Sequence, residues 1–163
     1  MPPVQGAQAS RLTLHIAGYV RPPELQNADT VNLARLGEGI LSDIRRLVRS
    51  DPTFGVRAAT RIAQSRLMGG ASNDGGWDDA GAYVVQPVEL LVYWTNPDDL
   101  NTAIEAVVKA CKSIKRSGGY RNTVKYVSRR QTDPDDLPTT QIPAVWVLRP
   151  LGGSEELTYL DKD

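Results

Sequence analysis

The chain has 163 residues, and its 19 basic residues equal its 19 acidic residues. That length fits one domain with a single hydrophobic core. Proteins whose main task is to bind nucleic acid or an anionic membrane usually carry a basic excess, so a formal charge of zero argues against those classes. With 40% hydrophobic and 23% charged residues, we expect an ordinary soluble globular protein.

Cysteine and histidine each occur once, as Cys111 and His15. One cysteine excludes an intrachain disulfide and a cysteine-based zinc site, and one histidine excludes a histidine-rich metal site. This usage favours a reducing compartment. The first ten residues lack the basic and apolar segments of a signal peptide, and no apolar run approaches the roughly 20 residues that cross a bilayer. We therefore expect no membrane partner.

The first regular elements are a strand and a helix. Residues Leu12–Val20 alternate between apolar and polar and are followed by Pro22, which predicts a half-buried strand. Asp29 or Thr30 is a candidate N-cap for the helix that follows. The apolar residues of this helix recur at helical spacing, and charged residues fill much of the remainder. Pro52 ends it. The apolar set is Leu33, Leu36, Ile40, Ile44, Leu47 and Val48.

A long-looped β-hairpin is expected next. Ala58–Met68 predicts a weak strand, and Gly69–Gly81 is a polar, glycine-rich loop. Tyr83–Trp94 is the most apolar stretch and predicts a central strand, with Pro87 at a bend or bulge near its start. Its even-numbered apolar residues share one face of the sheet.

The second half of the chain predicts another helix and three strands. The spacing of Thr102 and Glu105 is that of a capping box, so the helix is expected to begin there and to end at Gly118-Gly119. Its buried stripe consists of Ile104, Val107, Val108, Cys111 and Ile114. Strands are expected at 123–128 and 143–148, separated by an Asp- and Pro-rich loop, and a further short strand at 157–160.

These elements predict an α+β domain with a mixed or antiparallel sheet and two main helices on one face. The order β-α-β-β-α-β-β is that of a ferredoxin-like arrangement. We expect a flexible arm over residues 1–10, a single domain over 11–160 and a charged tail over 161–163.

The residues offer no catalytic, metal or cofactor site. His15 lies mid-strand without an acid or nucleophile at motif spacing, and Cys111 on an apolar helical stripe is better explained as a buried small hydrophobe. The glycine pairs lack the Gly-Lys-Ser/Thr of a phosphate loop. Gly37 and Gly39 fall within a helix, where close packing on the sheet explains them. Adjacent aspartates beside Gly, Pro or Asn are typical of turns.

Several residues are candidates for a contact with a partner. Trp77 stands in the Gly/Asp loop with little local apolar cover, beside Asp78 and Asp79. Basic residues line the second helix and the segment after it, where a solvated face is the simplest explanation and an acidic partner surface or nucleic-acid backbone the functional one. The basic candidates are Lys112, Arg116, Arg129 and Arg130.

Three segments resemble the tail terminator (tail completion) proteins of long-tailed bacteriophages. They are Leu12–Val20 with the helix ending at Asp51-Pro52-Thr53-Phe54-Gly55, the strand containing Val88–Tyr93, and the region from Thr102 through Val124 to Val147. In that family the helix similar to Thr102–Ser117 comes first, and the strand similar to Leu12–Val20 follows the one similar to Pro143–Leu148. The order in this chain is therefore rotated, as in a circular permutation.

The resemblance implies a structural protein of the virion tail or neck, assembled in the host cytoplasm. It would form a homo-oligomeric ring, expected to be a hexamer, that caps the tail tube protein and joins the head–tail connector protein. DNA would be present only as it passes through the ring lumen. Such a ring needs no enzyme chemistry and no cofactor. The alternatives are a ferredoxin-like RNA- or ligand-binding module and, last, a small enzyme that uses Cys111 or His15.

Overall fold

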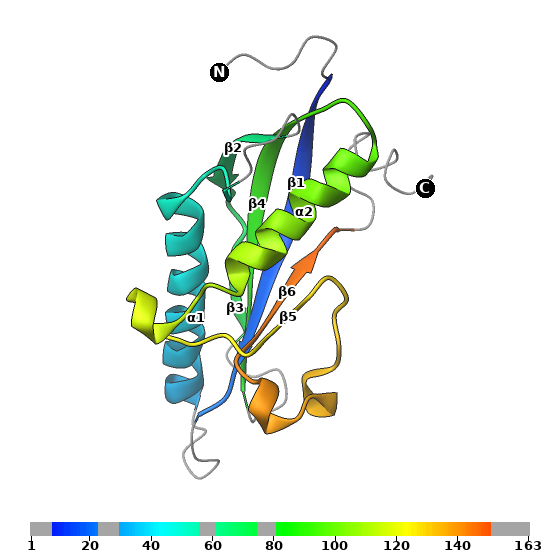
Figure 1. Ribbon diagram of the computed structural model, residues 1–163. Helices are drawn as coiled ribbons and strands as arrows, with labels where there is room; N and C mark the ends of the chain where they lie inside the picture. The colour runs from blue at the N-terminus through cyan, green and yellow to red at the C-terminus, as the bar shows by residue number, and fades with distance from the viewer. Residues whose placement is uncertain (1–7, 23–29, 56–60, 75–80, 151–163) are drawn as a thin grey trace.

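The computed structural model describes residues 8–22, 30–55, 61–74 and 81–150 (Figure 1). Within them the chain forms an α+β fold, with six strands in one mixed sheet and two main helices. The elements in chain order are β1 (Gln8–Val20), α1 (Thr30–Ser50), β2 (Arg61–Leu67), β3 (Ser72–Asp74), β4 (Ala82–Trp94), α2 (Asp98–Cys111), β5 (Tyr126–Ser128) and β6 (Ala144–Leu148), with short 3₁₀ turns η2 (Arg116–Gly118), η3 (Pro134–Asp136) and η4 (Thr139–Gln141).

The strand order in the sheet is β2-β4-β1-β6-β5, and β3 also pairs with β4. All pairs are antiparallel except β5 with β6. Each helix connects two parallel strands that have another strand between them: β1-α1-β2 encloses β4, and β4-α2-β6 encloses β1. This is the split β-α-β connectivity that the element order predicted. The longest pairing joins β1 to β4 from Gln8↔Trp94 to Val20↔Ala82.

Both helices pack on one face of the sheet, as expected (Figure 1). The even-numbered residues of β1 and β4 point to this face, because side chains alternate along a strand. Gly18 lies beneath α1, where an added Cβ would stand 2.9 Å from Ile40. Gly37 on α1 faces Asn73 of β3 at even closer range, so the close packing predicted for that glycine is confirmed. The Asn73 side-chain amide donates to the carbonyl of Ala34 (3.0 Å).

Part of the opposite face of the sheet is covered by the segment from Gln131 to Ile142. Beneath it Tyr19, Tyr83 and Trp146 are buried, with Leu137 packed against them. Two polar contacts attach the segment to the sheet. Arg21 forms an ion pair with Asp135 (3.2 Å), and the Gln131 side-chain amide donates to the Tyr83 hydroxyl (2.9 Å). These three aromatic side chains are therefore enclosed.

Four predicted boundaries are wrong. The arm predicted for residues 1–10 is too long, because β1 already begins at Gln8. Helix α2 begins at Asp98, not at a capping box at Thr102, whose hydroxyl donates to the Asp98 carbonyl (3.3 Å). The same helix ends at Cys111, and a separate 3₁₀ turn then leads to Gly119, which adopts φ +87°.

The fourth boundary is the start of the strand predicted at 123–128, since β5 comprises only Tyr126–Ser128. The backbone N–H groups of the preceding residues donate elsewhere: Val124 to the carbonyl of Ile114 (2.9 Å) and Lys125 to that of Pro143 (2.8 Å). The predicted strand at 157–160 and the N-cap candidate Asp29 lie outside the described residues.

Pro87 interrupts the hydrogen bonding of β4 on the side that faces β2 and β3. Strand β3 pairs as far as Val85, and β2 pairs from Val88 onward. The backbone N–H of Met68 donates to the Pro87 carbonyl (3.0 Å), but proline has no N–H to return. The buried side-chain amide of Gln86 donates to the Met68 carbonyl instead (3.0 Å). Its oxygen accepts from Arg45 Nε on α1 (3.0 Å).

Replacing this amide tests its role. We expect Gln86→Leu to lower the free energy of unfolding by about 2 kcal/mol, because the Met68 carbonyl loses its donor beneath α1. Urea denaturation measures the change. The control Gln64→Leu alters an exposed residue of β2 and should stay within about 0.5 kcal/mol of the original chain. Equal stability of the two variants would contradict this account.

Candidate interaction surfaces

Cys111 is fully buried on the inner side of α2. Burial raises the pKa of its thiol to about 12, so the nucleophilic thiolate is absent at neutral pH. This agrees with its interpretation as a small core residue. His15 is half-buried on β1, where it pairs with Pro87 and Leu148.

The described residues form neither a cluster of metal ligands nor a membrane-spanning helix. No group of three or more His, Cys, Asp or Glu residues among them is placed to hold a metal ion. Neither described helix has the length and apolar character needed to cross a bilayer.

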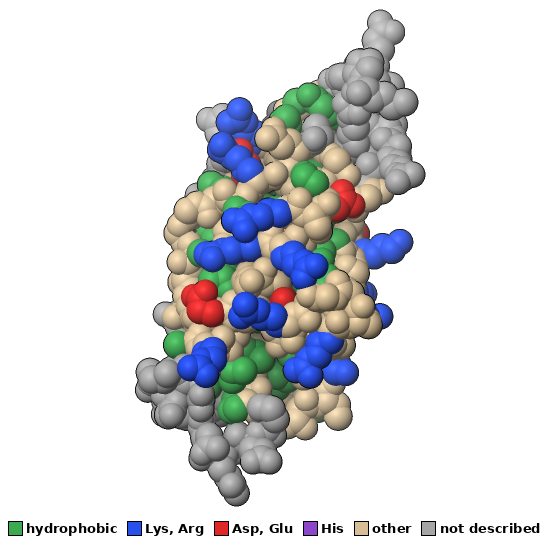
Figure 2. Space-filling model, turned by 90° about the vertical axis from the view of Figure 1, so that its left-hand side faces the viewer, with side chains coloured by type: hydrophobic (Ala, Val, Ile, Leu, Met, Phe, Trp, Pro, Cys, Tyr) green, Lys and Arg blue, Asp and Glu red, His purple; other side chains and the backbone are tan. Residues whose placement is uncertain are grey.

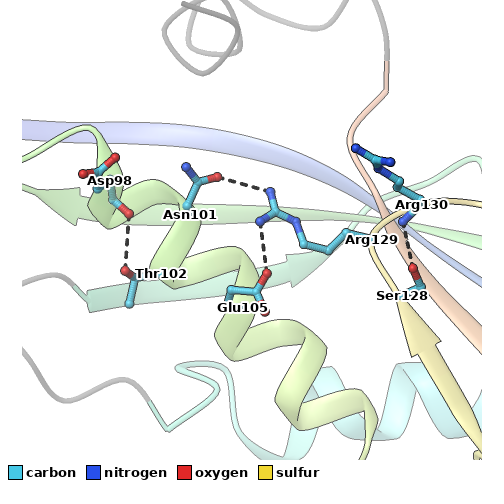
Figure 3. Close-up of polar contacts among 7 residues, drawn as sticks. All are labelled: Asp98, Asn101, Thr102, Glu105, Ser128, Arg129 and Arg130. Atoms are coloured by element: carbon cyan, nitrogen blue, oxygen red, sulfur yellow. Dashed lines mark hydrogen bonds and ion pairs between the residues drawn. The ribbon is translucent and has the colours of Figure 1, made fainter. Parts of the chain in front are cut away.

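Three of the seven predicted contact residues, Trp77, Asp78 and Asp79, lie outside the described residues. Lys112 and Arg116 are exposed, as predicted from the sequence. Arg129 forms its side-chain contacts inside the domain (Figure 3). Its guanidinium donates to Glu105 (3.1 Å) and to Asn101 (3.2 Å), both on α2. It therefore fastens β5 to α2. Arg130 is exposed, and its backbone N–H donates to the Ser128 hydroxyl (3.1 Å).

A groove of about 480 Å³ separates the end of α1 from α2. Apolar side chains of Leu47, Phe54 and Tyr120 form part of its wall, together with the small residues Ala106 and Ala110. Its charged lining residues are Lys109 and Asp51.

A surface that the sequence did not predict lies over α1. Figure 2 shows the face of the molecule that carries α1, on which Lys and Arg side chains gather and Asp and Glu side chains are few. We call this the basic face. It combines α1 with the segment from Lys112 to Arg121, which lies beside α1. The two segments together hold eight basic residues and two acidic ones. The basic ones are Arg35, Arg45, Arg46, Arg49, Lys112, Lys115, Arg116 and Arg121.

The two segments are joined through Asp43 of α1, which is only 2% exposed. The Asp43 carboxylate accepts hydrogen bonds from the backbone N–H groups of Arg121 (2.8 Å) and Asn122 (2.9 Å). It also accepts one from the Asn122 side-chain amide (2.9 Å). Asp43 is one of the charged residues that lie outside the apolar set of this helix in the sequence, yet the structure buries it. The helical period alone could not distinguish it from an exposed acid.

Arg46 completes this junction. Its guanidinium donates to the Gly119 carbonyl and lies over the Tyr120 ring, 5.2 Å from the ring centroid. Arg116 Nε in turn donates to the Arg121 carbonyl (3.0 Å). Carbonyls and an aromatic ring hold these cations in place without cancelling their charge.

Comparisons with protein-family models, curated proteins and solved structures found no match.

Substituting Asp43 tests the junction. We expect Asp43→Asn to reduce the free energy of unfolding by about 2–3 kcal/mol. The amide keeps the shape, but its NH2 group replaces one of the two oxygens that accept N–H hydrogen bonds. Hydrogen exchange should also accelerate at the amides of Arg121 and Asn122. The control Glu38→Gln makes the same charge change on an exposed residue and should shift stability by less than about 0.5 kcal/mol. Unchanged exchange at those amides would show that the junction does not depend on the carboxylate.

The reactivity of Cys111 gives a second prediction. A thiol reagent should leave the native chain unmodified at neutral pH and should label one thiol after denaturation, as followed by mass spectrometry. Burial removes both access and thiolate character. Rapid labelling of the native chain, with its circular dichroism spectrum unchanged, would refute the buried position of Cys111.

Proposed function

We propose that this chain is a structural protein of a bacteriophage tail or neck that assembles into a ring of identical subunits. The ring, of six copies, would cap the tail tube protein and present a surface to the head–tail connector protein. The proposal rests on the resemblance to tail terminators and on the distribution of charge along α2. It requires no active site and no cofactor.

The observation that carries the proposal is the opposite charge at the two ends of α2. Asp98 is exposed at the N-terminal end, while Lys112 and Arg116 are exposed beyond the C-terminal end. The 14 residues of this helix correspond to about 21 Å. A ring requires each subunit to join one surface to a different surface of its neighbour. Two unlike charged ends on one element satisfy that requirement, and complementary charges favour a defined register.

The strand neighbours agree with the rotated element order that the resemblance requires. β1 and β6 are the first and last described strands, and they are paired from His15↔Leu148 to Tyr19↔Ala144. A family member that joins these strands directly would therefore have the same sheet. This supports the proposed relationship as far as connectivity is concerned.

The main rival function, RNA binding through the open sheet face, is less well supported. Modules of that kind stack bases on aromatic side chains of central strands. Here Tyr19, Tyr83 and Trp146 occupy such positions but are buried beneath the segment that contains Leu137. No base could reach those rings without displacing that segment.

Light scattering after size-exclusion chromatography, followed by electron microscopy, tests the proposal. We expect closed rings of uniform diameter. Asp98→Lys and the pair Lys112→Glu with Arg116→Glu should each shift the population toward monomer, since like charges then face each other. Combining all three changes should restore rings, because the complementary contact is re-formed with reversed signs.

The matched control is Lys125→Glu, which reverses an exposed charge on the segment before β5. It should leave ring formation unchanged. A strictly monomeric chain that also fails to bind purified tail tubes would reject the proposal. If rings form and none of the charge reversals at α2 affects them, the ring proposal stands and the proposed contact between the α2 ends is wrong.

A further inference from the structure

We propose that the basic face binds the phosphate backbone of nucleic acid, without reading base sequence. This goes beyond the ring proposal and does not depend on it: the ring contact uses Lys112 and Arg116, whereas the phosphate contact is assigned to the arginines of α1 and to Arg121. The surface is defined by the exposed stripe of α1 and the segment from Lys112 to Arg121. Figure 2 shows Lys and Arg side chains gathered on this side of the molecule. It exists although the whole chain has a formal charge of zero.

The stripe follows from the helical period. Arg35, Glu38, Ser42, Arg46 and Arg49 are spaced by three or four residues and are all exposed. They therefore lie on one side of α1, opposite its apolar residues. From Arg35 to Arg49 the stripe is about 21 Å long. Duplex DNA carries one phosphate charge per roughly 1.7 Å of its axis, so the stripe can meet several phosphates at once.

The charge of this surface is not neutralised within the described residues. Their ion pairs join Arg21 to Asp135, Arg66 to Glu89 and Arg129 to Glu105, all away from the stripe. The second acid of the basic face, Asp43, is buried and used by backbone N–H groups. Glu38 is thus the one exposed carboxylate among the described residues of this surface.

The composition favours nucleic acid over a protein partner. Protein interfaces have an apolar centre rich in aromatic residues and depleted of charge. The exposed residues here are Arg and Lys with Ser and Gly, apart from Ala34 and Glu38. Arginine, serine and free backbone N–H groups are the donors that contact phosphates. Arginine also matches the geometry of a phosphate with two parallel hydrogen bonds.

The basic face lacks exposed aromatic side chains, on which the bases of single-stranded nucleic acid would stack. Its aromatic residue, Tyr120, is half-buried and lies under the Arg46 guanidinium, so it is not free to stack on a base. We therefore expect binding that is sensitive to salt and insensitive to sequence.

Fluorescence anisotropy of the full chain with labelled duplex DNA of about 30 base pairs tests this, at salt concentrations from about 50 to 200 mM. The variant Arg35→Glu/Arg49→Glu/Arg121→Glu reverses three guanidinium groups that contact no carboxylate among the described residues. We expect its affinity to fall at least about tenfold and the slope of log K against log salt to decrease by about 3 in magnitude. Two duplexes of unrelated sequence should bind the original chain equally.

The matched control, Arg11→Glu/Lys125→Glu/Arg130→Glu, changes the net charge equally at exposed positions outside the basic face. It should lose less than about threefold in affinity. Circular dichroism must show that both variants are folded. Equal losses in the two variants would overturn the proposal, as would no binding by the original chain at low salt.

A third result would assign the surface to a protein. If the original chain binds no duplex, while reversal at the basic face dissociates its oligomers, the surface is a subunit contact and the present proposal is wrong. Ring formation is measured separately by light scattering. Duplex binding without rings would support only the present proposal, and rings without duplex binding would support only the ring proposal.

Discussion

A carboxylate buried beneath a helix must find hydrogen-bond donors, or folding leaves its charge unsatisfied in a poorly hydrated site. Asp43 meets this constraint through the backbone of Arg121 and Asn122 and through the Asn122 side chain. The chain that leaves α2 must therefore return to α1 before it enters β5. This return sets the arginines of the two segments side by side. The basic face thus arises because one internal acid joins two basic segments that are far apart in the sequence.

The rest of the architecture follows from β1 and β4, whose pairing extends over the full length of both strands. Each contributes one apolar side to the helices, and Tyr19 of β1 and Tyr83 of β4 pack on the other side beneath the cover formed by residues 131–142. Pro87 removes one donor from this arrangement, and the Gln86 amide replaces it while also binding Arg45 of α1. The side chain that compensates for the missing N–H of Pro87 thereby also connects the sheet to α1.

Alternation and proline positions were sufficient to predict β1, α1 and β4, because their patterns are long and their faces differ sharply in polarity. The start of α2 was missed because Asn96 and Asp99 provide a stronger local signal than Thr102: Asp99 accepts from the backbone N–H groups of Thr95 and Asn96 (both 3.0 Å). The basic face could not be predicted, since it depends on a contact between residues 43 and 121. Trp77, the most distinctive candidate in the sequence, lies outside the described residues.

The outer strands of the sheet have a consequence for how copies of this chain can meet. β2 contains a register shift between Ile62 and Gln64 and ends near the charged pair Arg66–Glu89, while β5 at the other edge is three residues long. Irregular, charged or very short edges are poor templates for a further strand. Copies of the chain are thus discouraged from merging into a continuous sheet. Association would have to proceed through helix ends and loops, where side chains rather than backbone groups decide which neighbour fits.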